Sequence, residues 1–387
     1  TGRACRAGRR MKSLGMRAAG ERLERMKASV RWAGDGFRNL HPVLPGLRDP
    51  SAPRPTLSEF LCGGRRRVPA SPLPSVDPRA SWQRRPGSGL RATWLGHSTV
   101  LIEIDGLRVL TDPVWGRRAS PSQLVGPRRF QPVPVALDAL PPIDLVLVSH
   151  DHYDHLDYPT IRALARQGVP FVTALGVGAH LQAFGVDPGR ITELDWWESH
   201  RLPGSGLEVT AAPSQHFSGR GLKDRNATLW AAMVLRTDRH RVFFSGDTGL
   251  TTEYAAIRER LGPFDLVMLE VGAHHPSWGD IHLGPDNALQ AWQLLGGGPL
   301  LPIHWGTFSL ALHAWDEPAE TLLARAPGLA VPLLMPRLGE AVEPARATDS
   351  VTPWWRGIET PEAMPLTPAQ AEAELQKLPR SVPWPSD

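Results

Sequence analysis

Residues 145–155 read Leu145-Val146-Leu147-Val148-Ser149-His150-Asp151-His152-Tyr153-Asp154-His155. Four consecutive apolar residues are typical of a short buried strand, so we expect the polar residues on a loop at its end. Three imidazoles and two carboxylates cannot be buried together without partners. A divalent metal is the natural partner, and these ligand types favour zinc, with manganese or iron as alternatives.

The spacing within this motif indicates two adjacent metal sites. His150 and His152 are expected to point one way, and Asp154 and His155 another, so that one loop serves two ions. Three further positions near the ends of short apolar runs have suitable chemistry: His216, Asp247 and His304. A lone histidine at a strand end is more often structural, but together with the motif these positions complete a two-metal set.

The surrounding pattern predicts strands first and then strands mixed with helices, which indicates two packed sheets with helices outside. Asp105-Gly106 is expected to form a hairpin turn. The predicted strands are Ala92–Trp94, Val100–Ile104, Arg108–Thr111, Leu145–Val148, Phe171–Thr173, Leu207–Ala211, Leu229–Leu235, Arg241–Phe244, Leu266–Leu269 and Leu300–Ile303. The predicted helices are 18–31, Tyr158–Arg166, Thr252–Leu261 and Pro285–Leu295.

Composition divides the 387 residues into four parts. Residues 1–40 form a basic N-terminal tail, expected to be solvated and part helical, with contact to an anionic surface as the alternative. Residues 41–89 form a Pro/Arg-rich arm, 90–345 the compact domain, and 346–387 a Pro-rich C-terminal extension. The two cysteines argue against a disulfide scaffold or a thiolate zinc site.

The same composition limits location and partners. Because no run of about eighteen apolar residues occurs, a spanning helix is not expected. The expected location is the cytoplasm, with peripheral membrane contact as a further hypothesis from the basic tail. A homodimer is kept as a candidate assembly. No nucleic acid is expected, since the core lacks an added basic and aromatic domain.

The His-x-His-x-Asp-His motif, with the later His, Gly-Asp-Thr-Gly and His, resembles the metallo-β-lactamase superfamily over roughly residues 90–340. That resemblance implies a four-layer αββα sandwich with the metals at the rim between the sheets. It implies two Zn²⁺ ions per chain and gives each predicted ligand a place. One zinc would be bound by His150, His152 and His216, the other by Asp154, His155 and His304, and Asp247 would bridge them.

Other stretches are similar to the family of N-acylphosphatidylethanolamine-hydrolysing phospholipase D. They include residues 94–99, 110–113, 119–123, 126–130, 141–144, 193–198, 262–265 and 304–308, and the lead-in Phe37-Arg38-Asn39. The resemblance implies hydrolysis of a phospholipid to N-acylethanolamine and phosphatidic acid. The family carries a Gln-His pair before the last ligand, whereas this chain has Ile281-His282.

The chemistry of a two-metal phosphodiesterase requires a proton donor for the leaving alcohol. Asp154, or His282 through a water, is the candidate. His274, His275 and His282 are the predicted substrate contacts. A lactonase or another small-ester or phosphodiester hydrolase is the alternative within the superfamily. A non-catalytic metal- or membrane-binding module is the alternative of another class.

Overall fold

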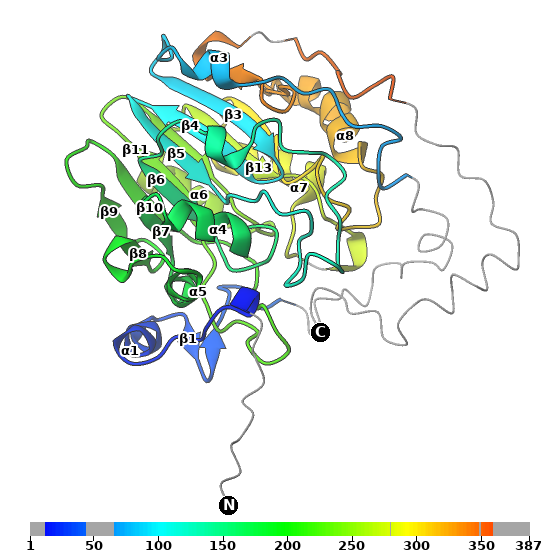
Figure 1. The fold of residues 1–387 in the computed structure, drawn as a ribbon. Coiled ribbons are helices and arrows are strands. Elements are labelled where there is room, and N and C mark those ends of the chain that lie inside the picture. The colour runs from blue at the N-terminus through cyan, green and yellow to red at the C-terminus, as the bar shows by residue number, and fades with distance from the viewer. Residues whose placement is uncertain (1–11, 44–65, 279, 348–349, 359–387) are drawn as a thin grey trace, which may run out of the picture.

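A computed structural model describes residues 12–43, 66–278, 280–347 and 350–358, and two sheets form its centre (Figure 1). The first sheet has seven strands. In spatial order they are β15 (Ala341–Val342), β3 (Leu90–Gly96), β4 (Thr99–Ile104), β5 (Leu107–Thr111), β6 (Leu145–Val148), β7 (Phe171–Ala174) and β8 (Ile191–Leu194). Pairing is antiparallel from β15 to β5 and parallel from β5 to β8.

The second sheet has six strands. In spatial order they are β14 (Leu300–Ile303), β13 (Leu266–Glu270), β12 (Arg241–Phe244), β11 (Ala232–Arg236), β10 (Glu208–Ala212) and β9 (Ser199–Arg201). Strands β12, β13 and β14 are parallel, and the other pairs are antiparallel. One continuous core of buried apolar side chains, which includes Leu147, Phe243 and Phe244, fills the space between the sheets and the space under the outer helices.

Helices cover both outer faces. Helices α4 (Tyr158–Ala165) and α5 (Val177–Phe184) lie on the seven-stranded sheet, while α6 (Glu253–Leu261) and α7 (Gly284–Leu294) lie on the other (Figure 1). Helix α8 (Glu317–Arg325) packs on α7, and the short α3 (Arg79–Trp82) precedes β3. The predicted four-layer αββα sandwich is confirmed. None of the helices in the described part of the chain is long and apolar enough to cross a membrane.

The predicted elements within the core are present with small shifts at their ends. The Asp105-Gly106 turn closes the β4–β5 hairpin, with Ile104 opposite Leu107. The strand expected from Leu229 begins only at Ala232, because the N–H of Ala231 donates to the Ser149 carbonyl at 3.1 Å. That bond ties the chain before β11 to the histidine motif. Strands β8, β9 and β15 and helices α3, α5 and α8 were not predicted.

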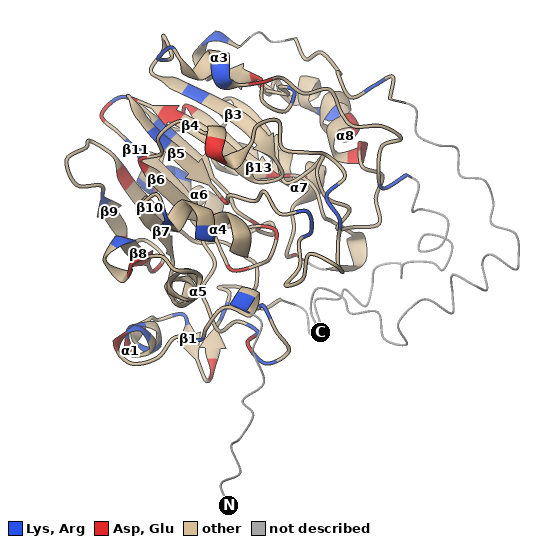
Figure 2. Ribbon diagram, viewed as in Figure 1, with Lys and Arg blue, Asp and Glu red and all other residues tan. Residues whose placement is uncertain are grey.

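Residues 12–43, which we call the N-terminal strap, pack on the body instead of forming a solvated tail. They contain α1 (Glu21–Ala28), β1 (Trp32–Ala33) and β2 (Gly36–Phe37), which lie beside α5 (Figure 1). Met26 and Phe37 are buried in the main core. The basic residues of α1 alternate with acidic ones (Figure 2), and Arg22 pairs with Glu193 on the body at 2.5 Å.

The predicted flanking segments are only partly described. Residues 1–11 of the tail, 44–65 of the arm and 359–387 of the extension lie outside the described residues. Within the described part of the extension, Trp355 is buried and its ring lies 5.9 Å from that of Trp305. The tryptophan pair at 354–355 is therefore docked on the chain next to His304.

Candidate metal centre

The strand directions bring the predicted ligands to one edge of the sandwich. In the first sheet β3, β5 and β6 run the same way, and in the second β10, β12, β13 and β14 do. The motif follows β6, while His216, Asp247 and His304 follow β10, β12 and β14. All seven predicted ligands therefore meet where carboxyl ends of strands from both sheets face each other.

The first group, the His216 cluster, contains His150, His152 and His216, and Asp247 lies beside it. One ligand atom from each of the four lies within 4.8 Å of the others. Nδ1 of His152 lies 2.8 Å from Nε2 of His150 and 3.2 Å from Nε2 of His216. Oδ2 of Asp247 lies 3.8 Å from Nε2 of His216. Three imidazoles thus face one small space.

The second group, the His304 cluster, contains Asp154, His155, His304 and also His97. Oδ2 of Asp154 lies 3.4 Å from Nε2 of both His155 and His304. Asp247 reaches this cluster too, with Oδ2 3.1 Å from Nε2 of His155 and Oδ1 3.2 Å from Nε2 of His304. Asp247 is therefore shared by both clusters, as the predicted bridging role requires.

The donor set fits a pair of divalent ions. Nε2 of His155, Nε2 of His304 and Oδ1 of Asp247 are buried and make no hydrogen bond. A buried polar atom without a hydrogen bond is costly, and several that converge on one space indicate a missing positive partner. Imidazole nitrogens and carboxylate oxygens are ligands that zinc accepts. Histidine and aspartate clusters able to bind metal are present, and the kind and number of ions remain predictions.

Supporting residues orient the imidazoles. Nδ1 of His155 lies 2.6 Å from Oδ2 of Asp112, a carboxylate that also accepts hydrogen bonds from the N–H and hydroxyl of Ser149. The N–H at Nδ1 of His216 donates to the carbonyl of Ile281 at 2.8 Å. Each contact fixes the tautomer and directs Nε2 to the cluster, as outer partners of metal ligands do.

The two clusters differ in charge. In the His304 cluster burial lowers the pKa of every imidazole. At His97 burial prevails and the pKa falls to about 3, whereas at His155 and His304 the carboxylates outweigh it. Asp247 and Asp154 hold the pKa of His155 well above its usual value and raise that of His304 to about 10. In the His216 cluster, burial and neighbouring imidazoles hold the pKa of His150 and of His216 well below the usual value.

His97 and Glu270 also belong to the site, and neither was among the predicted ligands or substrate contacts. Nε2 of His97, in the turn after β3, lies 2.9 Å from Oδ2 of Asp154. Glu270, at the end of β13, is fully buried and accepts hydrogen bonds from the N–H groups of Thr248 and Leu283. Its two oxygens each lie 3.1 Å from Nδ1 of His282. A carboxylate that ends an apolar strand was the available signal.

His282 lies between the clusters. Its ring centroid is 5.0 Å from that of His216 and 5.5 Å from that of His304. Burial lowers the pKa of His282, but Glu270 outweighs this and the pKa is raised overall. The residue carried over from the resemblance thus stands beside both groups of predicted ligands.

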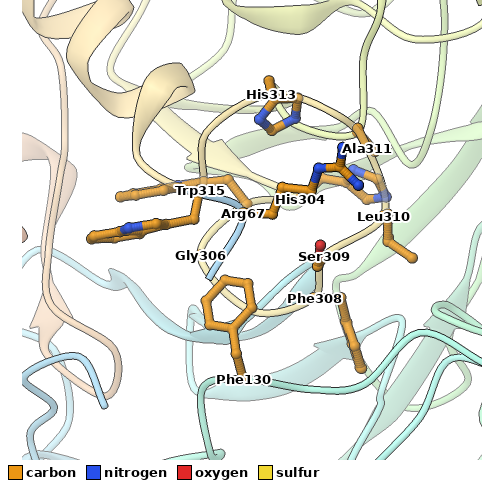
Figure 3. Close-up of a pocket in the computed structure, with 12 residues that line it drawn as sticks. Arg67, Phe130, His304, Gly306, Phe308, Ser309, Leu310, Ala311, His313 and Trp315 are labelled. Atoms are coloured by element: carbon orange, nitrogen blue, oxygen red, sulfur yellow. The ribbon is translucent and has the colours of Figure 1, made fainter. Parts of the chain in front are cut away.

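A narrow pocket of about 20 Å³ adjoins the His304 cluster. In Figure 3, Phe130 and Phe308 lie on the side opposite His313, with Arg67 and His304 between them. Of the other predicted contacts, His274 stacks on His313 at 4.7 Å, and Nδ1 of His275 bonds the Ser277 hydroxyl at 2.7 Å. Ala273 and His313, and not His274 or His275, line this pocket.

The backbone around the centre is strained. His97, Asp112 and His304 have φ angles of 53°, 32° and 66°, in the region that residues with a Cβ rarely adopt. The N–H of His304 donates to the His97 carbonyl at 2.9 Å, which joins two of these positions across the sheets. Strain of this kind persists only where the surrounding structure enforces it.

Comparison with known proteins places this centre in a family. A model described as the beta-lactamase superfamily domain matches residues 107–305. A Mycobacterium tuberculosis protein described as uncharacterized is 45% identical over 332 residues, 85% of this chain and 88% of its own. N-acyl-phosphatidylethanolamine-hydrolyzing phospholipase D 1 of Caenorhabditis elegans is 40% identical over 246 residues, 61% of this chain and 69% of its own.

Solved structures agree on the fold. An isothiocyanate hydrolase from Delia radicum gut bacteria gives a TM-score of 0.53 at 22% identity, covering 65% of this chain and 98% of its own. A metallo hydrolase from Ignicoccus hospitalis gives 0.51 at 22% identity, covering 65% and 97%. The matched stretch contains β5 to β14 and every predicted ligand, so the chain belongs to the metallo-β-lactamase superfamily and is a metal-dependent hydrolase of that superfamily.

Proposed function

We propose that the protein is a zinc-dependent phosphodiesterase of the phospholipase D type. Its substrate would be N-acylphosphatidylethanolamine, and its products N-acylethanolamine and phosphatidic acid. The observation that carries the proposal is the sharing of Asp247 between two clusters, since two adjacent metals suit displacement at a phosphodiester. The name of the Caenorhabditis elegans relative supports the lipid substrate.

The residues of the chain have distinct tasks in this proposal. One zinc would be bound by His150, His152 and His216, and the other by Asp154, His155 and His304. Asp247 would serve both ions. Zinc bound there would supply a water of lowered pKa and would offset charge on the phosphate. Arg67 lines the pocket beside His304 and offers a positive charge to the same phosphate.

His282 is the better candidate for the proton donor to the leaving alcohol. Asp154 is already contacted by three imidazoles, those of His97, His155 and His304. It is therefore placed as a ligand more than as a donor. His282 is held by Glu270 from one side and faces both clusters. General-acid assistance of this kind contributes about 10²- to 10⁴-fold in rate.

The apolar rings of Phe130 and Phe308 suit the hydrocarbon part of an N-acyl group. His282 is the proposed polar contact to the substrate. His274 would act indirectly through His313, on which it stacks, and His275 stays a predicted contact. Peripheral membrane contact, a homodimer and a cytoplasmic location also stay predictions, and co-sedimentation with anionic liposomes and light scattering measure the first two.

A small ester, lactone or phosphodiester is the second candidate substrate. The observation in its favour is the narrow pocket, whose 20 Å³ would hold little more than a water molecule. A lipid requires this pocket to widen, whereas a small cyclic ester requires only the two clusters.

The test is a substrate panel with the zinc-loaded protein. N-acylphosphatidylethanolamine, a glycerophosphodiester and a lactone are each offered with and without a chelator. We expect chelator-sensitive release of N-acylethanolamine. Turnover of lactones alone would overturn the lipid proposal, and turnover that survives complete removal of metal would overturn the metal mechanism.

A variant pair tests the proton donor. His282→Ala is expected to lower kcat by about 10²-fold or more while metal content stays at the wild-type level. His200→Ala, on the edge strand β9, is the matched histidine control. An unchanged kcat in His282→Ala would remove that residue from the reaction.

A further inference from the structure

The N-terminal strap holds the main chain of His216. Nδ2 of Asn39 donates to the His216 carbonyl at 2.7 Å, and Oδ1 of Asn39 accepts from the His216 N–H at 3.1 Å. The same Oδ1 accepts from Nε1 of Trp230 at 3.0 Å. One amide side chain therefore satisfies both backbone groups of a predicted ligand and ties them to a buried indole.

The strap also contacts the segment that orients the His216 ring. Val43 packs with Phe217 and Ile281 in a small apolar cluster separate from the main core. Ile281 supplies the carbonyl that accepts from Nδ1 of His216. The backbone of His216 and the acceptor for its ring are thus both adjacent to the strap.

The other end of the strap reaches the histidine motif. Arg220 is buried, and its guanidinium donates to the carbonyls of Ser13, Asp151 and Leu156. Nearby, the N–H of Met16 donates to Nδ1 of His180 at 3.2 Å. A buried guanidinium that bonds three carbonyls fixes their positions, since each bond lost would leave a buried charge short of partners. The strap is therefore joined to the ligand loop as well as to His216.

Backbone bonds keep the strap in register between these ends. The N–H of Phe37 donates to the Asn226 carbonyl at 2.8 Å. A Cβ added at Gly36 would lie 2.6 Å from that same carbonyl oxygen, so no larger residue fits without displacing the segment. Asn39 is three residues further on and depends on this close approach for its place.

We propose that the strap is a working part of the metal centre, in which Asn39 is a positioning residue for His216 and thereby retains the metal of the His216 cluster. The proposal rests on His216 being a ligand, as in the proposed function. It goes beyond the superfamily match, because that match begins at residue 107. The His304 cluster should not depend on Asn39, since no contact joins them within the described residues.

The test compares Asn39→Ala with Arg38→Ala in the full chain. Arg38 is the adjacent residue, is exposed and pairs with Asp35 on the strap itself, so its loss leaves the contacts of Asn39 intact. Zinc content, the rate of zinc transfer to a chelator and the absorption spectrum of the Co²⁺-substituted protein are measured. Loss of an outer partner weakens metal binding about 10- to 100-fold.

In Asn39→Ala we expect one of two metals to be released about 10- to 100-fold faster, with the other unchanged. Its Co²⁺ spectrum should change in the bands that are also lost in His216→Ala. Arg38→Ala should match the wild type. Equal release rates in Asn39→Ala and Arg38→Ala would overturn the inference and leave the proposed function standing, whereas a wild-type protein without metal would overturn the centre itself.

A second variant covers the case in which Asn39→Ala fails to fold. Gly36→Ala keeps Asn39 but forces the strap away from Asn226, and we expect the same selective loss of one metal. Retention of both metals at wild-type rates would overturn the inference. A parallel loss of both metals and of the fold, as measured by circular dichroism, would also overturn the inference. That outcome would show that the strap has a purely structural role.

Discussion

The His216 and His304 clusters use similar residues in opposite electrostatic surroundings. In the His216 cluster three imidazoles crowd together, and burial with mutual repulsion keeps the pKa of His150 and His216 low. In the His304 cluster Asp247, Asp154 and Asp112 lie around His155 and keep its pKa high. The balance of carboxylates to imidazoles, and not burial alone, decides which histidines carry protons before metal binds.

This difference has a consequence for metal uptake. A metal binds the neutral imidazole, so a protonated histidine must first lose its proton. The His216 cluster is neutral at physiological pH and can accept an ion directly. The histidines of the His304 cluster must first release protons. The carboxylates that stabilise the protonated imidazoles would then stabilise the metal.

The largest expected effect comes from Asp247, the residue that the clusters share. Asp247→Ala should disrupt both sites and lower hydrolytic activity by about a thousandfold or more, because metal ions contribute several kcal/mol to catalysis. Metal analysis and activity assays measure the two effects. If one metal stayed bound at full affinity, Asp247 would belong to a single cluster, and the two clusters would share no residue.

A smaller effect is expected from Asp112, which contacts His155 of the His304 cluster directly and reaches His150 of the His216 cluster only through the Ser149 hydroxyl. Asp112→Asn should weaken metal binding at the His304 cluster about 10- to 100-fold and weaken binding at the His216 cluster less, because its contact there is indirect. Competition with a chelator resolves the two sites. Asp138→Asn, at an exposed position, is the control, and equal weakening of both sites would show that the clusters are not independent.

The smallest effect is the pH dependence of metal uptake. Since the pKa of His304 is raised to about 10, this imidazole is protonated at neutral pH and competes with the metal. Affinity at the His304 cluster should therefore rise with pH, by about tenfold per pH unit for each displaced proton. Affinity at the His216 cluster should stay nearly constant near neutrality.

Titration calorimetry in buffers of different ionisation enthalpy counts the released protons. We expect release during filling of the His304 cluster only. Proton release at the other cluster would contradict the low pKa values of His150 and His216, and would show that the clusters differ less than their surroundings indicate.

The centre of the fold could be predicted because its signals are local. The motif at 149–155 directly follows an apolar run, so its loop position and its metal chemistry could be inferred from spacing. His216, Asp247 and His304 could be added because each follows another such run. The clustering of these residues agrees with that prediction, and metal analysis will test their roles as ligands.

Some site residues could not be predicted from the sequence, because they make contacts across long sequence separations or belong to no recognisable motif. Asn39 meets His216 across 177 positions, and nothing in the sequence near either residue reports that contact. Glu270 is one acidic residue at the end of one strand, which by itself is ordinary. The strap was expected to be solvated because its composition is basic, whereas Met26 and Phe37 are buried and α1 alternates its charges.

The residues that line the pocket could not be predicted from the local sequence either. His274 and His275 stay predicted substrate contacts, but neither lines the pocket beside the His304 cluster. The chain turns so that Ala273 and His313 line the space. Which side of a loop faces a cavity depends on packing against distant segments such as that of Arg67.

The left-handed backbone at His97, Asp112 and His304 limits how this protein can evolve. Conformations of this kind cost on the order of 1–3 kcal/mol each, and glycine would relieve them. Glycine at Asp112, however, would leave the N–H of Ser149 and Nδ1 of His155 without their buried acceptor. The strained backbone and the side chains of the centre are therefore retained together, and a thermostable descendant that keeps its function would gain its stability at other positions.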